Sequence, residues 1–339
     1  MDKSSKKLET AMNNSNEVYD VLGIDISKAK FDVALIQGNA KIKSKVFANN
    51  PEGFAELQAW LNLQSVTNLH GCMEATSTYG NALARFLVEA GYKVSIVNPS
   101  RPKAFGKSEL SRTKTDRADA KVIARFCAAL KPAPWTPPAL EIEQLQALVH
   151  RLDSLTAMQQ QEQNRLATAD PILVEAINAH IDFLKEQIEM TKKLIRQHFD
   201  QHPHLKSQRD LLTSIPGIAE LTATVLLAEI RDISAFDTAD QLAAFAGLTP
   251  REFSSGSSIH GKPRLSKIGN SRLRKSLFMP AIVARRYNAP ISAFCDRLTA
   301  KGKSKMSVIG AVMHKLLRQV FGVLKSQRSF DPNFVQIPS

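Results

Sequence analysis

Four carboxylates in the first 120 residues of the chain have the residue types and spacing needed to bind a divalent metal ion. Asp25 lies in LGIDIS, whose apolar neighbours predict a buried strand, and Glu74 closes a second apolar run, LHGCMEA. Asp116 and Asp119 stand one turn apart in TKTDRADA, so both face one side of a predicted helix. A buried carboxylate is unfavourable unless it is paired or metal-bound, and carboxylate oxygens suit Mg²⁺ and Mn²⁺. We expect Asp25, Glu74 and Asp119 to bind this metal. Asp116 would contribute a further ligand or orient one; alternatively, it pairs with Thr113 and only caps its helix.

A serine-rich stretch in the second half of the chain is the other candidate for chemistry. TPREFSSGSSIHGKPRLSKIGNSRLRKSLF spans residues 249–278, and four serines surround Gly256 in it: Ser254, Ser255, Ser257 and Ser258. Its glycines, Pro263 and its lack of apolar periodicity predict a loop before a basic helix. A serine hydroxyl there could attack a phosphodiester while arginines neutralise charge on the phosphorus oxygens. An ordinary surface loop is the alternative, and His260 is as well explained by solvation as by a role as the base.

Positive charge is concentrated on the same stretch. The chain carries 45 Lys and Arg against 32 Asp and Glu, a net charge of +13, and residues 251–305 hold 13 basic and two acidic residues. This concentration is typical of a surface that contacts nucleic-acid phosphates, although a solvated basic face has the same composition. The side chains expected to make the contacts are Arg264, Lys267, Arg272, Arg274 and Lys275.

The carboxylates require an α/β domain to position them, and residues 18–135 have that pattern. Three β-prone runs, VYDVLGIDIS, FDVALIQ and KIKSKVFAN, are followed by alternating predicted helices and strands. We expect a mixed sheet, with the last helix of the domain carrying two of the acids. Residues 1–17 are polar and predict a mobile tail, whereas KPAPWTPP at 131–138 predicts a stiff linker that ends the domain.

The second half of the chain is predicted to be helical. Leucines and isoleucines at three- and four-residue spacing predict two helices over residues 139–203, as an antiparallel hairpin or an intersubunit coiled coil; a dimerising hairpin is favoured. LLTSIPGIAELTATVLLAEI predicts two helices joined at Pro216-Gly217. That turn is either a plain αα-hairpin or a helix-hairpin-helix turn in which Gly217 meets a nucleic-acid backbone. We expect residues 204–330 to form a mainly α C-terminal domain, followed by a tail at 331–339.

Composition restricts the class of protein. A hydrophobic content of 43% and a charged content of 23% are typical of a globular protein. No apolar run approaches the length of a membrane span and no signal peptide opens the chain, so we expect no membrane partner. The three cysteines lie far apart without a CxxC pair, which predicts neither a zinc site nor a disulfide framework. These features favour the bacterial cytoplasm, with association to the nucleoid during activity.

Two sets of motifs resemble one known family. GIDISKAKFDVAL, MEATSTYG and KTDRADAKVIA resemble the RuvC-like, RNase H-fold domain of the insertion-sequence-110 family, the DEDD transposases. Further along, SIPGIAELTATVLLAEI, AAFAGLTP, the serine–glycine segment and LSKIGNSRLRKSL resemble the C-terminal transposase domain of that family. The resemblance covers about residues 20–330 and keeps the motifs in the family's order. The family's four acids fall on Asp25, Glu74, Asp116 and Asp119.

The resemblance implies a recombinase that excises and inserts its own insertion sequence. The family's catalytic serine precedes a glycine after the AGLTP segment, which places it on Ser255, with Ser254 as the near competitor. The serine would form a covalent phosphoserine link to DNA, while the carboxylates hold Mg²⁺ against the same phosphate. The resemblance also implies guidance by a structured bridge RNA. It further implies a homodimer or homotetramer, in which serine and carboxylates come from different subunits.

Two other classes of protein remain open from the residues alone. A Mg²⁺-dependent, structure-selective nuclease, such as a junction resolvase, would use the four carboxylates and leave Ser255 as a structural residue. A non-enzymatic nucleic-acid-binding protein would have no need to keep all four acids. The nuclease leaves the basic serine segment unexplained, so the recombinase is favoured.

Overall fold

The structure describes residues 19–38, 41–75, 78–108, 116–255 and 259–333. The expected tail at 1–17 lies outside the described residues, as do residues 334–339 of the other expected tail and Thr113, Ser257 and Ser258. In the computed structural model the chain divides into two compact units, Met1–Pro137 and Pro138–Ser339. They are called unit 1 and unit 2 and are described separately.

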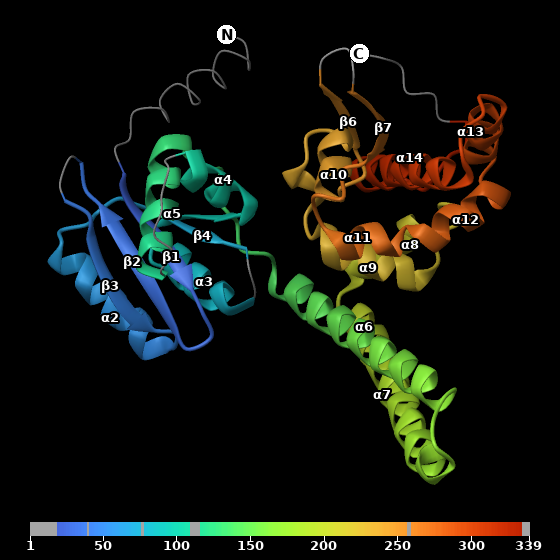
Figure 1. The fold of residues 1–339 in the computed structure, drawn as a ribbon, viewed down its shortest axis with the longest axis horizontal. Helices are drawn as coiled ribbons and strands as arrows, with labels where there is room; N and C mark the ends of the chain where they lie inside the picture. The colour runs from blue at the N-terminus through green and yellow to red at the C-terminus, as the bar shows by residue number, and fades with distance from the viewer. Residues whose placement is uncertain (1–18, 39–40, 76–77, 109–115, 256–258, 334–339) are drawn as a thin grey trace. The chain divides into compact units, whose positions relative to one another are not determined.

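Unit 1 is an α/β layer structure built on a five-stranded mixed sheet (Figure 1). The strands are β1 (Asp20–Ile26), β2 (Lys30–Ile36), β3 (Lys43–Ala48), β4 (Leu69–Glu74) and β5 (Lys93–Val97). Their order is β3-β2-β1-β4-β5; β1, β2 and β3 form an antiparallel meander, and β4 and β5 continue parallel to β1. The mixed sheet expected from the three β-prone runs is therefore confirmed, and its order agrees with the RNase H-like fold that the resemblance implies.

Helices cover both faces of this sheet. α2 (Pro51–Leu63) and α3 (Asn81–Glu89), which follows the short 3₁₀ helix η1 (Thr78–Gly80), share a core with one face. α5 (Asp116–Leu130) packs on the opposite face, with α4 (Ser100–Ser108) against it. After α5 the proline-rich linker stays attached to unit 1, because the backbone N–H of Trp135 donates to the carbonyl of Val94, 2.6 Å away.

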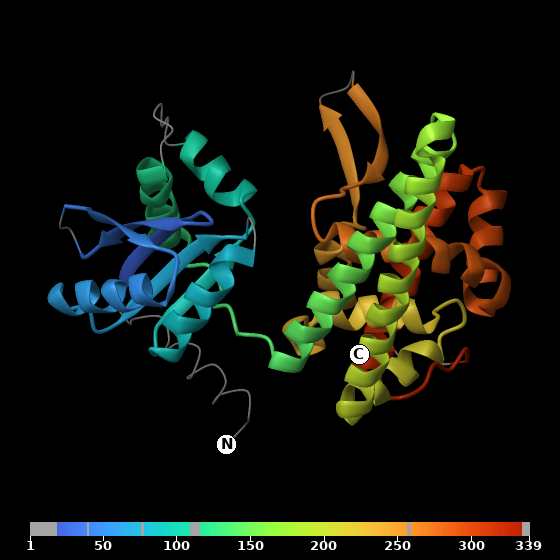
Figure 2. The ribbon, with the colours of Figure 1, turned by 90° about the horizontal axis from the view of Figure 1, so that it is seen from below.

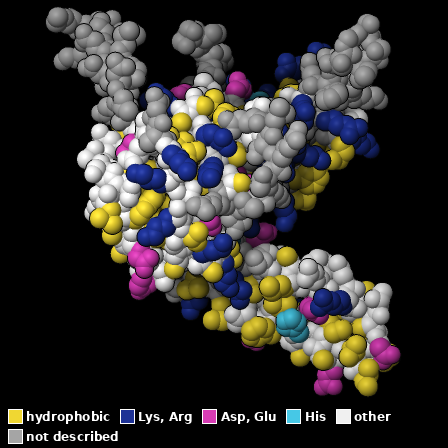
Figure 3. All heavy atoms as spheres, turned by 60° about the vertical axis from the view of Figure 1, so that its left-hand side comes forward, with side chains coloured by type: hydrophobic (Ala, Val, Ile, Leu, Met, Phe, Trp, Pro, Cys, Tyr) yellow, Lys and Arg dark blue, Asp and Glu magenta, His cyan; other side chains and the backbone are white. Residues whose placement is uncertain are grey.

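Unit 2 is mainly helical, as predicted, and begins with two long helices. α6 (Leu140–Leu166) and α7 (Val174–Gln201), separated by η2 (Pro171–Leu173), pack side by side (Figure 2). Leu152 of α6 and Leu184 of α7 are both buried in the core that the two helices share within one chain. Packing between α6 and α7 of the same chain therefore explains the regular spacing of the leucines and isoleucines. Hydrophobic side chains also lie exposed on the hairpin (Figure 3), including Phe183, Met190 and Leu194 of α7.

The remaining elements of unit 2 are helices and one two-stranded ribbon. They are α8 (Pro203–Thr213), α9 (Glu220–Ile230), η3 (Ile233–Ala235), α10 (Ala239–Phe245), β6 (Pro250–Ser255), β7 (Ile259–Leu265), α11 (Ser271–Ser276), α12 (Phe278–Tyr287), α13 (Ala289–Ala300) and α14 (Lys305–Ser326). α14 is long and apolar enough to span a membrane by composition, contrary to our expectation that no segment would be. Half of that stretch is buried inside unit 2, and Val312, Leu316 and Val320 belong to its core. α14 therefore has the burial of a core helix.

Two local predictions in unit 2 were wrong. Ser254 and Ser255 do not lie in a loop but end strand β6, which pairs with β7 in antiparallel register. A ribbon of two strands is held by backbone hydrogen bonds, so it shows little of the apolar alternation on which strand prediction depends. The basic helix expected from residue 271 onward is two helices, α11 and α12, that meet at Leu277. Pro280 lies in the first turn of α12, where its missing N–H breaks no helical hydrogen bond.

Candidate active site and nucleic-acid interface

Asp25 and Glu74 lie beside each other near the carboxyl ends of two central strands. β1 and β4 are parallel neighbours, and the pairing of Ile24 with Met73 brings the next residues, Asp25 and Glu74, alongside. Gly23 faces α5, and alternate residues of a strand face the same side, so Asp25 also faces α5. This is the edge at which α/β sheets place their functional sites.

α5 adds a third carboxylate because it approaches β1 unusually closely. A Cβ atom on Gly23 would lie 2.1 Å from the carbonyl oxygen of Ala120 and 2.3 Å from the nitrogen of Ala124, both backbone atoms of α5. Only glycine permits this contact between strand and helix. Asp119 immediately precedes Ala120, so the close contact brings Asp119 to the end of β1 that carries Asp25.

The electrostatics of Glu74 show that the three acids act on one another. Burial raises the pKa of the Glu74 carboxyl, the charges of Asp25 and Asp119 raise it further, and Lys103 of α4 lowers it. Like charges held this close favour the protonated form of one of them unless a cation is added. The three predicted residues Asp25, Glu74 and Asp119 are therefore brought together by the fold.

The donor set suits a hard divalent cation. Mg²⁺ usually keeps several waters and takes only one or two carboxylates from the protein, so it does not require a closed cage. Among the residues that the structure describes, no group of three or more Asp, Glu, His or Cys side chains is arranged to hold a metal ion. The side chain of Asp116, the fourth expected ligand, lies outside the described residues. The magnesium site expected at these acids therefore stays a prediction.

Sequence reasoning missed a neighbour of this cluster, Asp32. It pairs directly with Asp25 across β1 and β2, on the same sheet face, and its side chain is almost fully buried. The ammonium of Lys30 lies 3.3 Å from the Asp32 carboxylate and offsets its charge. The signal was present in FDVAL, where an acid interrupts a β-branched and aromatic run in the same way as Asp25 does in LGIDIS.

The serine candidates are described only by their backbone. In the β6–β7 ribbon, Ser254 pairs with His260 and Ser255 pairs with Ile259. The side chains of residues 252–263 lie outside the described residues, so the assignment of the nucleophile to Ser255 stays a prediction. The same holds for any role of His260 as a base.

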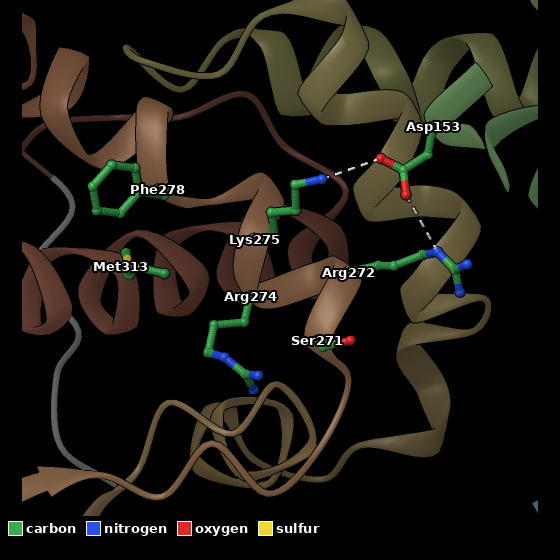
Figure 4. A pocket seen from close by; sticks show the side chains of 7 residues that line it. All are labelled: Asp153, Ser271, Arg272, Arg274, Lys275, Phe278 and Met313. Atoms are coloured by element: carbon green, nitrogen blue, oxygen red, sulfur yellow. Dashed lines mark hydrogen bonds and ion pairs between the residues drawn. The ribbon is translucent and has the colours of Figure 1, made fainter. Parts of the chain in front are cut away.

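The five basic residues predicted to contact phosphates have different surroundings. Arg264 and Lys267 are exposed on and after β7. Arg272 and Lys275 of α11 reach the carboxylate of Asp153 on α6 (Figure 4). Arg274 instead points away from Asp153 and donates a 3.0 Å hydrogen bond to the carbonyl of Ala246, which ties α11 to the end of α10.

A buried polar network, not foreseen from the sequence, holds the start of α11. Glu229 of α9 is buried, and its two carboxylate oxygens meet His150 of α6 at 2.8 Å and the Asn270 amide at 2.6 Å. Burial alone would raise the pKa of Glu229, but the hydrogen bonds from His150 and Asn270 outweigh it and the pKa is lowered. Asn270 also accepts from the backbone N–H of Leu273, which caps α11. α6, α9 and α11 are therefore linked through one carboxylate.

Gly217, at the turn between α8 and α9, has a packing explanation. Its φ of +106° is strained for other residues, and a Cβ there would lie 2.8 Å from the Cβ of Ala284 on α12. The turn therefore packs against α12, as a plain αα-hairpin does. The packing contact accounts for the glycine, and a contact of Gly217 with a nucleic-acid backbone stays a prediction.

An α/β domain with a carboxylate cluster, in one chain with a basic helical unit, is the architecture of an enzyme that acts on nucleic acids. Residues 22–169 match a family model described as "Transposase", and residues 209–296 match one described as "Transposase IS116/IS110/IS902 family". The chain belongs to the IS110 family of transposases and is a DNA recombinase of that family.

Curated relatives agree over most of the chain. The pilin gene-inverting protein of Moraxella bovis is 36% identical over 314 residues, which cover 91% of this chain and 97% of that protein. The transposase for insertion sequence element IS1328 of Yersinia enterocolitica is 26% identical over 301 residues, 78% of this chain and 83% of that protein. The solved structure of Thermus thermophilus RuvC is a weaker match, with 18% identity, a TM-score of 0.26, and coverage of 34% of this chain and 98% of that chain.

Proposed function

We propose that this recombinase excises and inserts its insertion sequence by metal-assisted attack of a serine on DNA. The observation that carries the proposal is the convergence of Asp25 and Asp119 on Glu74, whose pKa both acids raise. A set of acids that repel one another in the free protein is suited to a cation delivered with, or completed by, a DNA phosphate. Inversion of a DNA segment, which the Moraxella relatives are named for, is the same cleavage and rejoining with a different arrangement of ends.

The residues have separate roles in the proposed reaction. Asp25, Glu74 and Asp119 bind Mg²⁺ or Mn²⁺, and Asp116 contributes a ligand or orients one. When bound, the metal stabilises negative charge on the phosphate oxygens. The Oγ of Ser255 forms a bond to phosphorus, and a deoxyribose oxygen leaves with the proton that the hydroxyl gives up. Rejoining reverses these steps with a different deoxyribose hydroxyl as the attacking group.

The proposed partners follow from the family and from charge. A bridge-type RNA would pair with donor and target DNA, and the basic residues around α11 would contact its phosphates or those of the DNA. Arg264, Lys267, Arg272 and Lys275 are exposed and suit this role. A homodimer or homotetramer would supply serine and carboxylates from different subunits. The exposed apolar residues on α7 are compatible with such an assembly.

Metal binding by the purified protein tests the carboxylate assignment independently of activity. Titration with Mn²⁺, followed by its electron paramagnetic resonance signal, should show binding that Asp25→Asn removes while the fold is kept. Glu56→Gln is the matched control, because Glu56 is an exposed acid on α2 of the same unit. Wild-type Mn²⁺ binding and wild-type recombination by the Asp25→Asn protein would exclude the site.

A further inference from the structure

Unit 2 contains a pocket of about 640 Å³ beside α11, with a charged end and an apolar end. Arg272 and Lys275 of α11 and Asp153 of α6 form the charged end (Figure 4). Phe278 of α12 and Met313 of α14 form the apolar end. The volume lies within the range of pockets that accept small organic ligands.

At the charged end, a carboxylate of the protein lies where an anion would bind. The Lys275 ammonium is 3.3 Å from Asp153 Oδ1, and the Arg272 Nε is 3.8 Å from Asp153 Oδ2. Lys275 is 77% exposed and Asp153 45% exposed, so this ion pair is weak. An internucleotide phosphate carries one negative charge shared by two terminal oxygens, as a carboxylate does, so it can take the place of Asp153 at these two cations.

The helix that carries the two cations, α11, is joined to α6 by a buried hydrogen-bond network in unit 2. The buried Glu229 accepts from His150, one turn before Asp153 on α6, and from Asn270, the cap of α11. Because Glu229 joins α6 to α11, the backbone positions of Asp153 and Lys275 stay opposite each other whether or not the two side chains are paired. The helices that carry Asp153 and the two cations are therefore held in place, so only exposed side chains must rearrange to bind an anion.

At the apolar end, an aromatic ring is left partly uncovered. Phe278 is 36% exposed, whereas Met313 beside it is buried and belongs to the core of unit 2. A flat ring at the edge of a cationic pocket is the feature on which proteins stack an unpaired base. Bases inside a duplex are already stacked, so a paired base would gain nothing from this ring.

We propose that this pocket binds one unpaired nucleotide of a single-stranded nucleic acid, with its phosphate replacing Asp153 and its base against Phe278. The inference rests on the proposed function insofar as that function makes the α11 region the nucleic-acid interface. In the free protein Asp153 occupies the phosphate position and lowers the affinity of the pocket. Unpaired DNA and unpaired RNA share this chemistry, and the experiment separates them.

Fluorescence anisotropy with labelled oligonucleotides tests the proposal on the full chain. The probes are single-stranded DNA and single-stranded RNA of about 12 nucleotides, and the corresponding DNA duplex. Asp153→Asn should bind both single strands about tenfold more tightly, with a steeper dependence on salt, since two cations are released for phosphate. Asp182→Asn is the matched control, because it removes the same charge from an exposed ion pair with Lys185 on α7.

Substitution at the apolar end provides the second arm. Phe278→Ala should weaken single-strand binding about fivefold or more and leave duplex binding unchanged. Met279→Ala, at the exposed neighbouring position, should change neither. The larger loss for DNA or for RNA identifies which strand uses the pocket.

The outcomes separate the pocket from the proposed function. If Arg272→Gln with Lys275→Gln leaves all binding unchanged, α11 is not the interface and that part of the proposed function fails. If the double substitution weakens binding but Asp153→Asn behaves like Asp182→Asn, the nucleotide pocket is wrong while the interface stands. Equal losses of affinity for duplex and for single strands in Phe278→Ala would likewise contradict the nucleotide pocket.

Discussion

Substitution of Gly23 by alanine should separate α5 from β1 and loosen the carboxylate cluster. The new Cβ would meet backbone atoms of Ala120 and Ala124 at 2.1 and 2.3 Å, and backbone atoms of a packed helix cannot rotate away as a side chain can. α5 must therefore retreat by about 1 Å, an overpacking that costs roughly 1–3 kcal/mol. For a unit of this size the melting temperature should fall by roughly 3–10 °C. Because α5 carries Asp119, the stabilisation of unit 1 by Mg²⁺ should fall as well.

The two tryptophans make this measurement specific to unit 1. Trp60 and Trp135 both pack against the core of α2, α3 and the sheet, so tryptophan fluorescence follows the unfolding of unit 1 alone. Gly71→Ala on β4 of the same sheet is the control, since its Cβ would meet its nearest neighbours at 3.7 Å, an ordinary packing distance. A wild-type unfolding midpoint for Gly23→Ala would refute the close approach of α5 and with it the placement of Asp119.

Three further substitutions test other parts of the structure. Because the pKa of Glu74 is raised, metal-free unit 1 should lose stability as the pH rises through that pKa. Glu74→Gln should therefore be more stable than the wild-type protein at neutral pH, but Mg²⁺ should no longer stabilise it. Unfolding followed by fluorescence from about pH 4 to about pH 8 measures both effects. Leu184→Ala should cost about 2–5 kcal/mol in guanidinium unfolding followed by circular dichroism, because its side chain is buried between α6 and α7. Serine at both Phe183 and Met190 should leave stability within about 0.5 kcal/mol of wild type but reduce the mass in solution, measured by light scattering, since both side chains are exposed.

Each of these has an outcome that would contradict it. Glu74→Gln fails if its stability has the same pH dependence as the wild-type protein. A wild-type denaturation curve for Leu184→Ala would remove the shared core of α6 and α7. Retention of the wild-type mass by the double serine variant would show that α7 is not the assembly surface.

The strands that carry the acids were predictable because local composition determines them. β1 and β4 are short apolar runs with an acid near their carboxyl ends, and the burial of such runs in a central sheet leaves few other conformations. Asp32 lies near the amino end of β2, which runs antiparallel to β1, and it was overlooked because no motif pointed to it. The residue that sets the approach of α5 is a glycine, whose role is visible only once the helix is placed against the strand.

The surroundings of the basic residues could not be predicted, since they depend on contacts between distant parts of the chain. Lys275 and Asp153 are 122 positions apart, and nothing near either residue indicates the other. Arg274 lies between two residues that reach Asp153, yet its guanidinium serves packing at Ala246. The number of basic residues therefore predicted a basic surface, but not which of its side chains are paired or hydrogen-bonded within the protein.

Peptide mapping of a trapped protein–DNA adduct tests the central claim most directly. The protein is incubated with element-end DNA, Mg²⁺ and the proposed bridge-type RNA, then denatured, digested and analysed by mass spectrometry. We expect a phosphodiester-linked nucleotide on Ser255, absent in Ser255→Ala and in Asp25→Asn and retained in Ser254→Ala. An adduct on Ser254, or cleaved strands without an adduct on any serine, would contradict it, and the second result would make the protein a metal-dependent nuclease.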